Sequence, residues 1–229
     1  MARKLAAVLT LAVIALLIGL GIWQVERLSW KRALIAHTER RLAAAPVAAP
    51  GPEAWLRIGR DDAYTKVTVT GRYRRGADTF VLAVTAYGGG FWVLTPLTTD
   101  RFTVLVNRGF VPPERRSAVP APGGVVTVNG LLRVTEPKGA FLRSNDPAAD
   151  RWYSRDVAAI AAKHRLDHVA PYFIDASVAP GADPAALPRA GLTVVSFPNN
   201  HLLYAITWFG MAALLAFMAW RATTRDPAR

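Results

Sequence analysis

"LAAVLTLAVIALLIGLGIW", residues Leu5–Trp23, is a run of nineteen residues without a charged side chain. A second run of the same length and character, "LLYAITWFGMAALLAFMAW", extends from Leu202 to Trp220. At about 1.5 Å per residue, each run forms a helix nearly as long as the hydrocarbon core of a bilayer is thick, roughly 30 Å. The sequence therefore predicts two transmembrane helices that enclose the rest of the 229 residues.

The first apolar run must be distinguished from a cleaved signal peptide, because Arg3 and Lys4 precede it. It is longer than the roughly 7–15 apolar residues of a signal peptide. The segment that follows, "GIWQVERLSWKR" at residues 21–32, lacks the small-residue pattern of a cleavage site. We therefore expect an anchor that stays in the mature protein.

Basic residues near the second run predict the orientation in the membrane. Arg221, Arg225 and Arg229 follow it, whereas the ten residues before Leu202 contain no Lys or Arg. Because cytoplasmic flanks carry the excess of basic residues, the C-terminus is expected in the cytoplasm, and two spans place the N-terminus there as well. The long segment between the spans is then expected outside the cytoplasm, which for a chain in the inner membrane of a bacterial cell means the periplasm.

Composition excludes several classes of function. The chain has no cysteine, which removes disulfides, thiolate metal sites and iron–sulfur clusters. The formal net charge of +12 would suit a nucleic-acid-binding protein, but much of it is Arg in the segments next to the two spans. Attraction to anionic membrane lipid explains that placement, and no nucleic-acid partner is expected.

The chain is expected to divide into four parts. Residues 1–23 form the first anchor, and residues 24–50 continue its helix before a Pro/Ala linker. Residues 51–200 form a mainly antiparallel β domain, and residues 201–229 form the second span with a basic cytoplasmic tail. The fold class predicted is therefore a membrane protein in which two transmembrane helices flank a mainly antiparallel β (α+β) extracytoplasmic domain.

Alternating side chains support the β domain. In "YTKVTVTGRYRRG", Tyr64–Gly76, Val67 and Val69 point to one side of a strand and Thr68 and Thr70 to the other. One helix is expected to begin at Asp156, whose carboxylate can cap it. Further strands are expected at residues 79–87, 90–99, 101–111, 124–134, 170–177 and 192–197.

Catalytic motifs are scarce. The chain contains no phosphate-binding glycine loop, no G-x-S-x-G and no H-E-x-x-H. His164 and His168 are spaced to share a helix face and bind a metal, but basic neighbours favour two surface histidines. Two carboxylate pairs lie among turn-forming residues and are interpreted as solvated loops: Asp61 with Asp62, and Asp146 with Asp150.

The start of the second apolar run carries the most informative polar residue. His201, Tyr204, Ala205 and Trp208 follow the spacing i, i+3, i+4 and i+7, which places them on one helix face. Tyr and Trp favour the membrane interface, so this face fits an ordinary interfacial belt. It also fits a flat macrocycle held by a neutral imidazole as axial ligand, with aromatic side chains around it.

Six segments taken together resemble the Surf1 family, whose members are cytochrome c oxidase assembly factors. The most specific are W-Q-x-x-R-x-x-W-K after the first span and N-x-H-x-x-Y-A-x-x-W-F-G at the entry to the second. The segments are "GIWQVERLSWK" (21–31), "VLVNRGFVP" (104–112), "GLLRVTEP" (130–137), "SNDPAADRWYSRDVAAIA" (144–161), "PYFIDA" (171–176) and "NNHLLYAITWFG" (199–210).

The resemblance implies a function and a candidate site. Proteins of this family promote the maturation of oxidase subunit I, and bacterial members are thought to bind haem a through a histidine that corresponds to His201. The family's glycine–tryptophan element corresponds to Gly21 and Trp23, and its tyrosine to Tyr204. Phe110 stands where many relatives have Trp. The residues alone do not distinguish haem a from haem b or haem o.

The resulting hypothesis is a transient haem a site near the outer membrane surface. His201 would bind the iron through Nε2 or Nδ1, with Tyr204 and Trp208 against the ring in the seam between the two spans. Trp23, at the end of the first span, is also expected among the haem-binding residues. The propionates would meet Arg27 or Lys31, which could equally reach lipid phosphate.

The remaining expectations concern partners and rival functions. The β domain would dock on oxidase subunit I or on the haem a synthase. Asn107 and Arg108, near the end of the strand expected at residues 101–111 and before Gly109, are expected to serve a structural turn first and a partner contact second. A non-haem scaffold that stabilises folding subunit I is the main alternative. A tethered hydrolase is a second one, and it would require paired carboxylates or an activated nucleophile in a pocket of the β domain.

Overall fold

The computed structural model describes residues 1–117, 119, 122–137, 139, 142–183, 185–193 and 199–224. The chain forms two compact units. The first consists of Met1–Glu39 and Val195–Arg229, and the second of Arg40–Val194. The expected basic tail residues Arg225 and Arg229 lie outside the described part of the chain.

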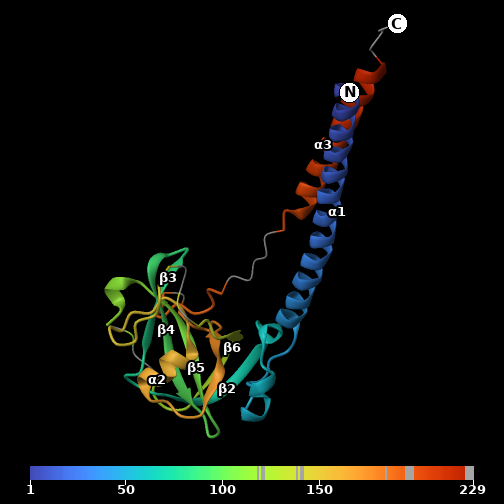
Figure 1. Ribbon diagram of the computed structural model, residues 1–229. Coiled ribbons are helices and arrows are strands. Elements are labelled where there is room, and N and C mark those ends of the chain that lie inside the picture. The colour runs from blue at the N-terminus through green and yellow to red at the C-terminus, as the bar shows by residue number, and fades with distance from the viewer. Residues whose placement is uncertain are drawn as a thin grey trace. The chain divides into compact units, whose positions relative to one another are not determined.

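Two long helices dominate the first unit. Helix α1 spans Ala2–Ala43 and helix α3 spans His201–Thr224, and the two run side by side in opposite directions (Figure 1). The chain has no proline before Pro46, so nothing interrupts α1 after its apolar run. The expected continuation of the first helix beyond Trp23 is confirmed.

The less exposed residues of each helix form a line with alternating steps of three and four residues. This spacing is the heptad pattern of paired helices, which keeps one face of each helix against its partner. On α1 the line opposite α3 is Thr10, Ile14, Leu17, Gly21 and Gln24, and the same spacing continues past the first residue of α3 at Leu28, Lys31, Ile35 and Thr38. On α3 it is His201, Ala205, Trp208, Ala212, Leu215 and Ala219.

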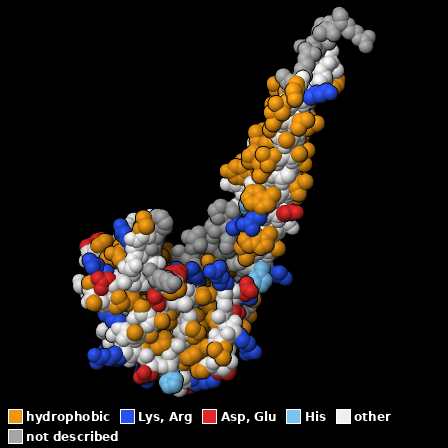
Figure 2. All heavy atoms as spheres, viewed as in Figure 1, with side chains coloured by type: hydrophobic (Ala, Val, Ile, Leu, Met, Phe, Trp, Pro, Cys, Tyr) orange, Lys and Arg blue, Asp and Glu red, His pale blue; other side chains and the backbone are white. Residues whose placement is uncertain are grey.

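Over the two uncharged runs, Leu5–Trp23 and Leu202–Trp220, the remaining surface of the helix pair is apolar. Large side chains such as Leu9, Leu16, Ile206 and Leu214 are exposed along it, and Figure 2 shows the hydrophobic side chains gathered over the two helices. Both helices are long and apolar enough to cross a membrane. The two apolar helices expected from the sequence are therefore present, and their exposed surface is unfavourable in water.

Seven strands form the sheet of the second unit. Their order is β1-β2-β6-β7-β5-β4-β3, and β4 also pairs with β2. That extra pairing closes β2, β6, β7, β5 and β4 into a ring, so the domain is a small barrel with β1 and β3 attached. The strands are β1 (Val47–Ala48), β2 (Lys66–Tyr73), β3 (Thr79–Thr85), β4 (Gly88–Thr98), β5 (Thr103–Val111), β6 (Val126–Val134) and β7 (Val169–Ala176).

The core of the barrel has two layers. Val104 and Val106 of β5 belong to an apolar cluster with Val67 and Val69 of β2. Leu105, which points to the other side of the same strand, packs in a second cluster that includes Ile160 of helix α2 (Val157–His164). β5 is therefore buried along its whole length, because both of its faces are covered.

Most expected strands are present, with two differences. β5 pairs with β7 in parallel, as β1 does with β2, so the mainly antiparallel sheet is mixed. The strand expected at residues 192–197 is not found at Leu192 and Thr193, and its other residues lie outside the described ones. Helix α2 begins where expected, with the Asp156 carboxylate accepting a hydrogen bond from the Ala159 amide. The described residues of this unit also form three short 3-10 helices: Pro52–Arg57, Arg60–Asp62 and Pro113–Arg115.

Candidate functional site

His201 is the first residue of α3, and its imidazole faces α1. Nδ1 of His201 lies 2.7 Å from Oε1 of Gln24, the distance of a strong hydrogen bond. Gln24 is only 9% exposed, whereas His201 is half-buried. The histidine therefore keeps part of its ring accessible while one ring nitrogen is engaged across the helix pair.

The helices pack directly against each other beside this contact. A Cβ on Gly21 would lie 2.6 Å from Cε1 of Phe209, far closer than an ordinary contact. Ala205 and Ala212 are the most deeply buried residues of α3. Small residues allow membrane helices to approach closely, so the seam is occupied by protein atoms at the level of Gly21.

The other residues expected at the site do not all share one helix face with His201. Trp208 shares the half-buried line with His201, but Tyr204 is 53% exposed and Trp23 is 50% exposed. Arg27 is also exposed, with its guanidinium carbon 4.6 Å from the ring centroid of Trp30. Counted from His201, the residues of α3 that face α1 are those at i+4 and i+7, which are Ala205 and Trp208. Tyr204, at i+3, lies beside the contact between the two helices instead of within it.

Known proteins resemble most of this chain. The model of the SURF1 family matches residues 11–213, which cover α1 from Leu11 onward, the whole barrel, and α3 as far as Ala213. This chain belongs to the SURF1 family. It is 34% identical to Surfeit locus protein 1 of Rattus norvegicus over 90% of this chain and 72% of that protein. The corresponding protein of Homo sapiens is 34% identical over 87% and 71%, and a SURF1-like protein of Monosiga brevicollis is 33% identical over 87% and 80%.

The barrel of this SURF1-family chain contains a buried charge network around Asp175. This carboxylate is 3% exposed and accepts hydrogen bonds from Arg133 at 2.8 Å, Asn107 at 2.8 Å and Thr193 at 2.9 Å. Arg155 lies 3.3 Å from it. Because these residues come from five separate parts of the chain, the network ties together β5, β6, β7, the segment before α2 and the segment after β7.

The expectation that Asn107 and Arg108 lie in a turn at a strand end is wrong. β5 continues to Val111, so both residues are inside the strand and buried. Gly109, with φ of 130°, lies against the Arg189 carbonyl, and this close approach lets β5 continue where the sequence suggests a turn. The buried Asn107 side chain donates a hydrogen bond to Asp175 and so links β5 to β7.

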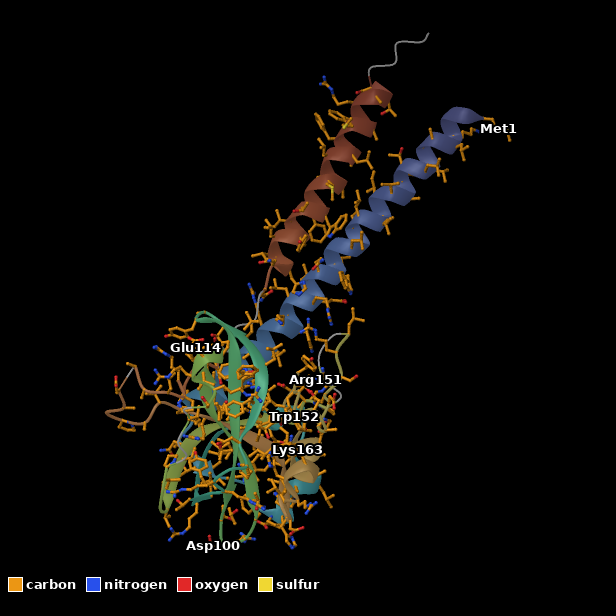
Figure 3. The ribbon with its side chains drawn as sticks, turned by 90° about the vertical axis from the view of Figure 1, so that its left-hand side faces the viewer. Met1, Asp100, Glu114, Arg151, Trp152 and Lys163 are labelled. Carbon is orange, nitrogen blue, oxygen red and sulfur yellow. The ribbon has the colours of Figure 1, made fainter. Side chains whose placement is uncertain are left out.

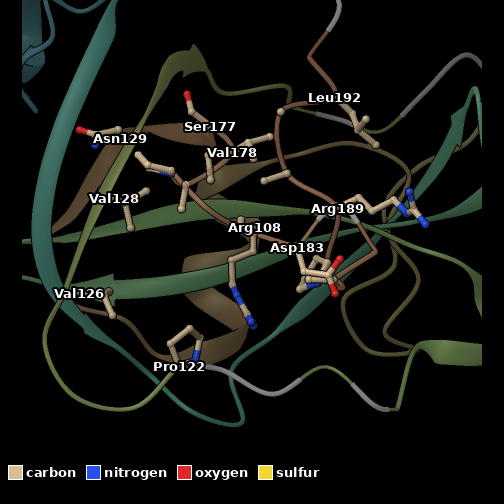
Figure 4. Close-up of a pocket in the computed structure, with 18 of the residues that line it drawn as sticks. Arg108, Pro122, Val126, Val128, Asn129, Ser177, Val178, Asp183, Arg189 and Leu192 are labelled. Atoms are coloured by element: carbon tan, nitrogen blue, oxygen red, sulfur yellow. The ribbon is translucent and has the colours of Figure 1, made fainter.

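A cavity of about 600 Å³ lies in the barrel domain, with Arg108 extending between Pro122 and Asp183 (Figure 4). The Arg108 guanidinium is 3.8 Å from the Asp78 carboxylate and lies over the ring of Tyr73. Burial raises the pKa of Tyr73 to about 12. Among its described lining residues, Asp183 is the one carboxylate and no histidine is present, so the cavity does not offer the groups that the hydrolase alternative requires.

The remaining histidine candidates serve local structure. α2 ends at His164, so His168 does not share a helix face with it. His164 Nε2 instead lies 2.9 Å from the Thr79 hydroxyl. No group of three or more His, Cys, Asp or Glu side chains able to hold a metal occurs among the described residues.

The carboxylate candidates also have local partners. Asp62 accepts a hydrogen bond from the Gly59 amide within a turn next to Asp61. Asp146 pairs with Arg151 at 2.7 Å, and Asp150 pairs with Lys163 at 2.6 Å. Arg151, Trp152 and Lys163 lie together on one side of the domain (Figure 3).

Sequence reasoning missed Gln24 and Phe209 as partners of the site. A signal for Gln24 was available, because an amide side chain directly after an apolar run needs a hydrogen-bond partner if it is buried. Phe209 carried no such signal, since one more aromatic residue in an apolar helix does not reveal which neighbour it contacts.

Proposed function

We propose that this protein is an assembly factor for haem–copper cytochrome c oxidase that binds haem a and assists its insertion into subunit I. Membership of the SURF1 family supports the assembly role. The observation that carries haem binding is the half-buried His201 at the outer end of the helix pair, with one ring nitrogen bonded to Gln24. Haem a is cargo in this proposal, and the chain has no catalytic residue in it.

We place the helix pair in the inner membrane of a bacterial cell, as two spans. Arg221 at the end of α3, followed in the sequence by Arg225 and Arg229, supports cytoplasmic termini. The barrel domain is then periplasmic. The exposed apolar side chains of α1 and α3 support insertion of both helices into a membrane, because an apolar surface of this kind is stable in the hydrocarbon core of a bilayer.

The residues at the site fit a haem bound at the surface of the helix pair. The contact of Gly21 with Phe209 leaves no room for a macrocycle between the helices at that level. We therefore revise the hypothesis that the ring lies inside the seam and place it over the seam, where His201 reaches it. Trp23 and Tyr204 have exposed ring surface at this level, and Trp208 lies one turn below Tyr204.

A single imidazole suits a carrier that must release its cargo. Haem held by two axial ligands exchanges with difficulty, whereas one neutral histidine leaves the opposite face of the iron open. Arg27 is exposed and stacked on Trp30, so it is available to a propionate or to a lipid phosphate. Weak, one-sided binding of this kind supports transfer to subunit I and uptake from the haem a synthase.

The test is the absorption spectrum of protein purified from cells that also make haem a. The His201→Ala variant should lose the haem a signal, and the His37→Ala variant should keep it, because His37 is an exposed residue elsewhere on α1. Equal haem a content in both variants would remove His201 from the site.

The alternative proposal is a scaffold that stabilises folding subunit I without binding haem. Absence of haem from the wild-type protein, together with full oxidase assembly in cells that carry His201→Ala, would favour it. Assembled oxidase is measured in those cells by its own absorption spectrum and by co-purification of subunit I with this protein.

A further inference from the structure

Gln24 makes an unusual contact for a polar residue of a membrane helix. The hydroxyls of Thr10, Thr38 and Thr207 donate to carbonyls of their own helices four residues earlier. Gln24 instead reaches across to α3, where its Oε1 lies 2.7 Å from His201 Nδ1. Burial of an amide in apolar surroundings is costly unless it is hydrogen-bonded, so this contact fixes the position of both side chains.

The chemistry of the two atoms fixes the direction of the hydrogen bond. The structure turns Oε1 of Gln24 towards the ring, and an amide oxygen can only accept, so in this orientation His201 Nδ1 is the donor and carries the proton. A neutral imidazole has one N–H group, which leaves Nε2 with a free electron pair. In metal sites, the hydrogen bond of one ring nitrogen decides which nitrogen is left to bind the metal.

We propose that Gln24 is a positioning residue that holds His201 in its Nδ1–H tautomer and presents Nε2 to the iron of haem a. This inference rests on the proposed function, and it decides between the two ring nitrogens that the sequence left open. The heptad lines support it, because Gln24 and His201 both occupy inward positions of their helices. The close packing at Gly21, one turn from Gln24, keeps the two backbones near enough for this hydrogen bond.

A hydrogen bond from Nδ1 does more than orient the ring. It makes the imidazole a stronger electron donor through Nε2, and a stronger acceptor at Gln24 strengthens this effect. Gln24→Glu should therefore strengthen the bond between iron and histidine, and Gln24→Leu should weaken it. A purely structural role for Gln24 predicts no such opposite changes.

The first experiment needs no haem. Protein labelled with 15N in its histidines is examined by NMR in lipid nanodiscs at a pH where imidazole is neutral, and His201 is assigned by loss of its signal in His201→Ala. The wild-type signal should show a protonated Nδ1 and an unprotonated Nε2. In Gln24→Leu the Nε2–H form should become populated, and in Val25→Leu, an exposed neighbouring position, the spectrum should stay as in wild type.

The second experiment uses protein loaded with haem a. The iron–histidine stretching frequency of the reduced protein, measured by resonance Raman spectroscopy, should rise in Gln24→Glu and fall in Gln24→Leu. The affinity for haem a should be about 10–100-fold lower in Gln24→Leu, the usual effect of removing such a partner. Far-UV circular dichroism checks that each variant retains its helices.

The outcomes separate the inference from the proposed function. If wild-type protein takes up no haem a, the proposed function fails and the positioning role fails with it. If the wild type is loaded but the iron–histidine frequency is the same in wild type, Gln24→Leu and Gln24→Glu, the role of Gln24 is overturned and the proposed function stands. An Nε2–H tautomer in wild type would overturn the inference directly.

Discussion

Replacement of Gly21 by leucine should weaken the pairing of α1 with α3. A Cβ at this position would lie 2.6, 2.7 and 2.8 Å from three atoms of the Phe209 ring, whereas ordinary contacts begin at 3.4 Å. The ring or the helix must therefore move by 0.8 Å for the first added carbon alone. Overpacking of this kind costs about 1–3 kcal/mol, which corresponds to roughly a 5- to 150-fold change in the pairing equilibrium.

The pairing can be measured inside one chain because the protein has no cysteine of its own. Cysteines introduced by Val8→Cys and Met218→Cys, both at exposed positions, carry a donor and an acceptor dye. Energy transfer between the dyes is followed as SDS is added to protein in mild detergent. The SDS concentration at which energy transfer is half lost reports the free energy of pairing, and Gly21→Leu should lower it.

Two matched variants test whether the Phe209 ring is the cause. In a Phe209→Ala background the added leucine finds space, so most of the loss should disappear, with a coupling energy of about 0.5–3 kcal/mol. Gly19→Leu should have little effect, because a Cβ there would meet nothing within 4 Å. The packing argument is refuted if Gly21→Leu pairs as strongly as wild type, or if Phe209→Ala does not relieve its effect.

Three further predictions concern the barrel and the topology. Asp175→Asn should destabilise the barrel by about 1–3 kcal/mol, measured as a lower urea midpoint of tryptophan fluorescence, because the buried guanidinium groups of Arg133 and Arg155 lose one of the two carboxylates they share and keep only Glu136. Asp146→Asn, in an exposed pair, should change the midpoint little. Burial, and then the charge of Lys163, lowers the pKa of His164. As the pH falls, this histidine therefore becomes protonated in the unfolded chain before it does in the folded one, and the thermal midpoint of unfolding should decrease below about pH 6.5. In His164→Gln this decrease in the thermal midpoint should be smaller. In Leu56→Cys, the cysteine at this fully exposed position should react with a membrane-impermeant maleimide added on the periplasmic side of the membrane. The cysteine in Thr224→Cys should not react under the same conditions. The reverse pattern would contradict the proposed orientation.

Periodicity was sufficient to predict much of the fold. The alternation that placed Val67 and Val69 on one side of a strand is the pattern of burial observed. The uninterrupted run after Trp23 predicted the long α1 correctly. Barrel closure was not predictable in the same way, because the pairing of β2 with β4 joins residues that follow no local pattern.

Tertiary contacts explain where the sequence misled. Asn107, Arg108 and Gly109 are typical of a turn, yet the buried hydrogen bond from Asn107 to Asp175 and the approach of Arg189 to Gly109 keep them in a strand. At the candidate site, helical spacing placed His201 inward, but it could not show that Tyr204 faces outward, since that depends on where the partner helix lies. The roles of both residues in haem binding remain predictions.

The hydrogen bond between Gln24 and His201 offers a last test, because an apolar pair at the same two positions would hold the helices together equally well. When both partners of a buried hydrogen bond are replaced by apolar side chains of similar shape, stability changes little, whereas removal of one partner leaves the other unsatisfied at a cost of about 1–3 kcal/mol. The double variant Gln24→Leu with His201→Leu should therefore pair its helices as tightly as wild type in the dye assay while binding no haem a, and Gln24→Leu alone should pair more weakly. A double variant less stable than either single variant would mean that the contact exists to hold the helices together, and the case for a ligand-presenting histidine would lose its structural support.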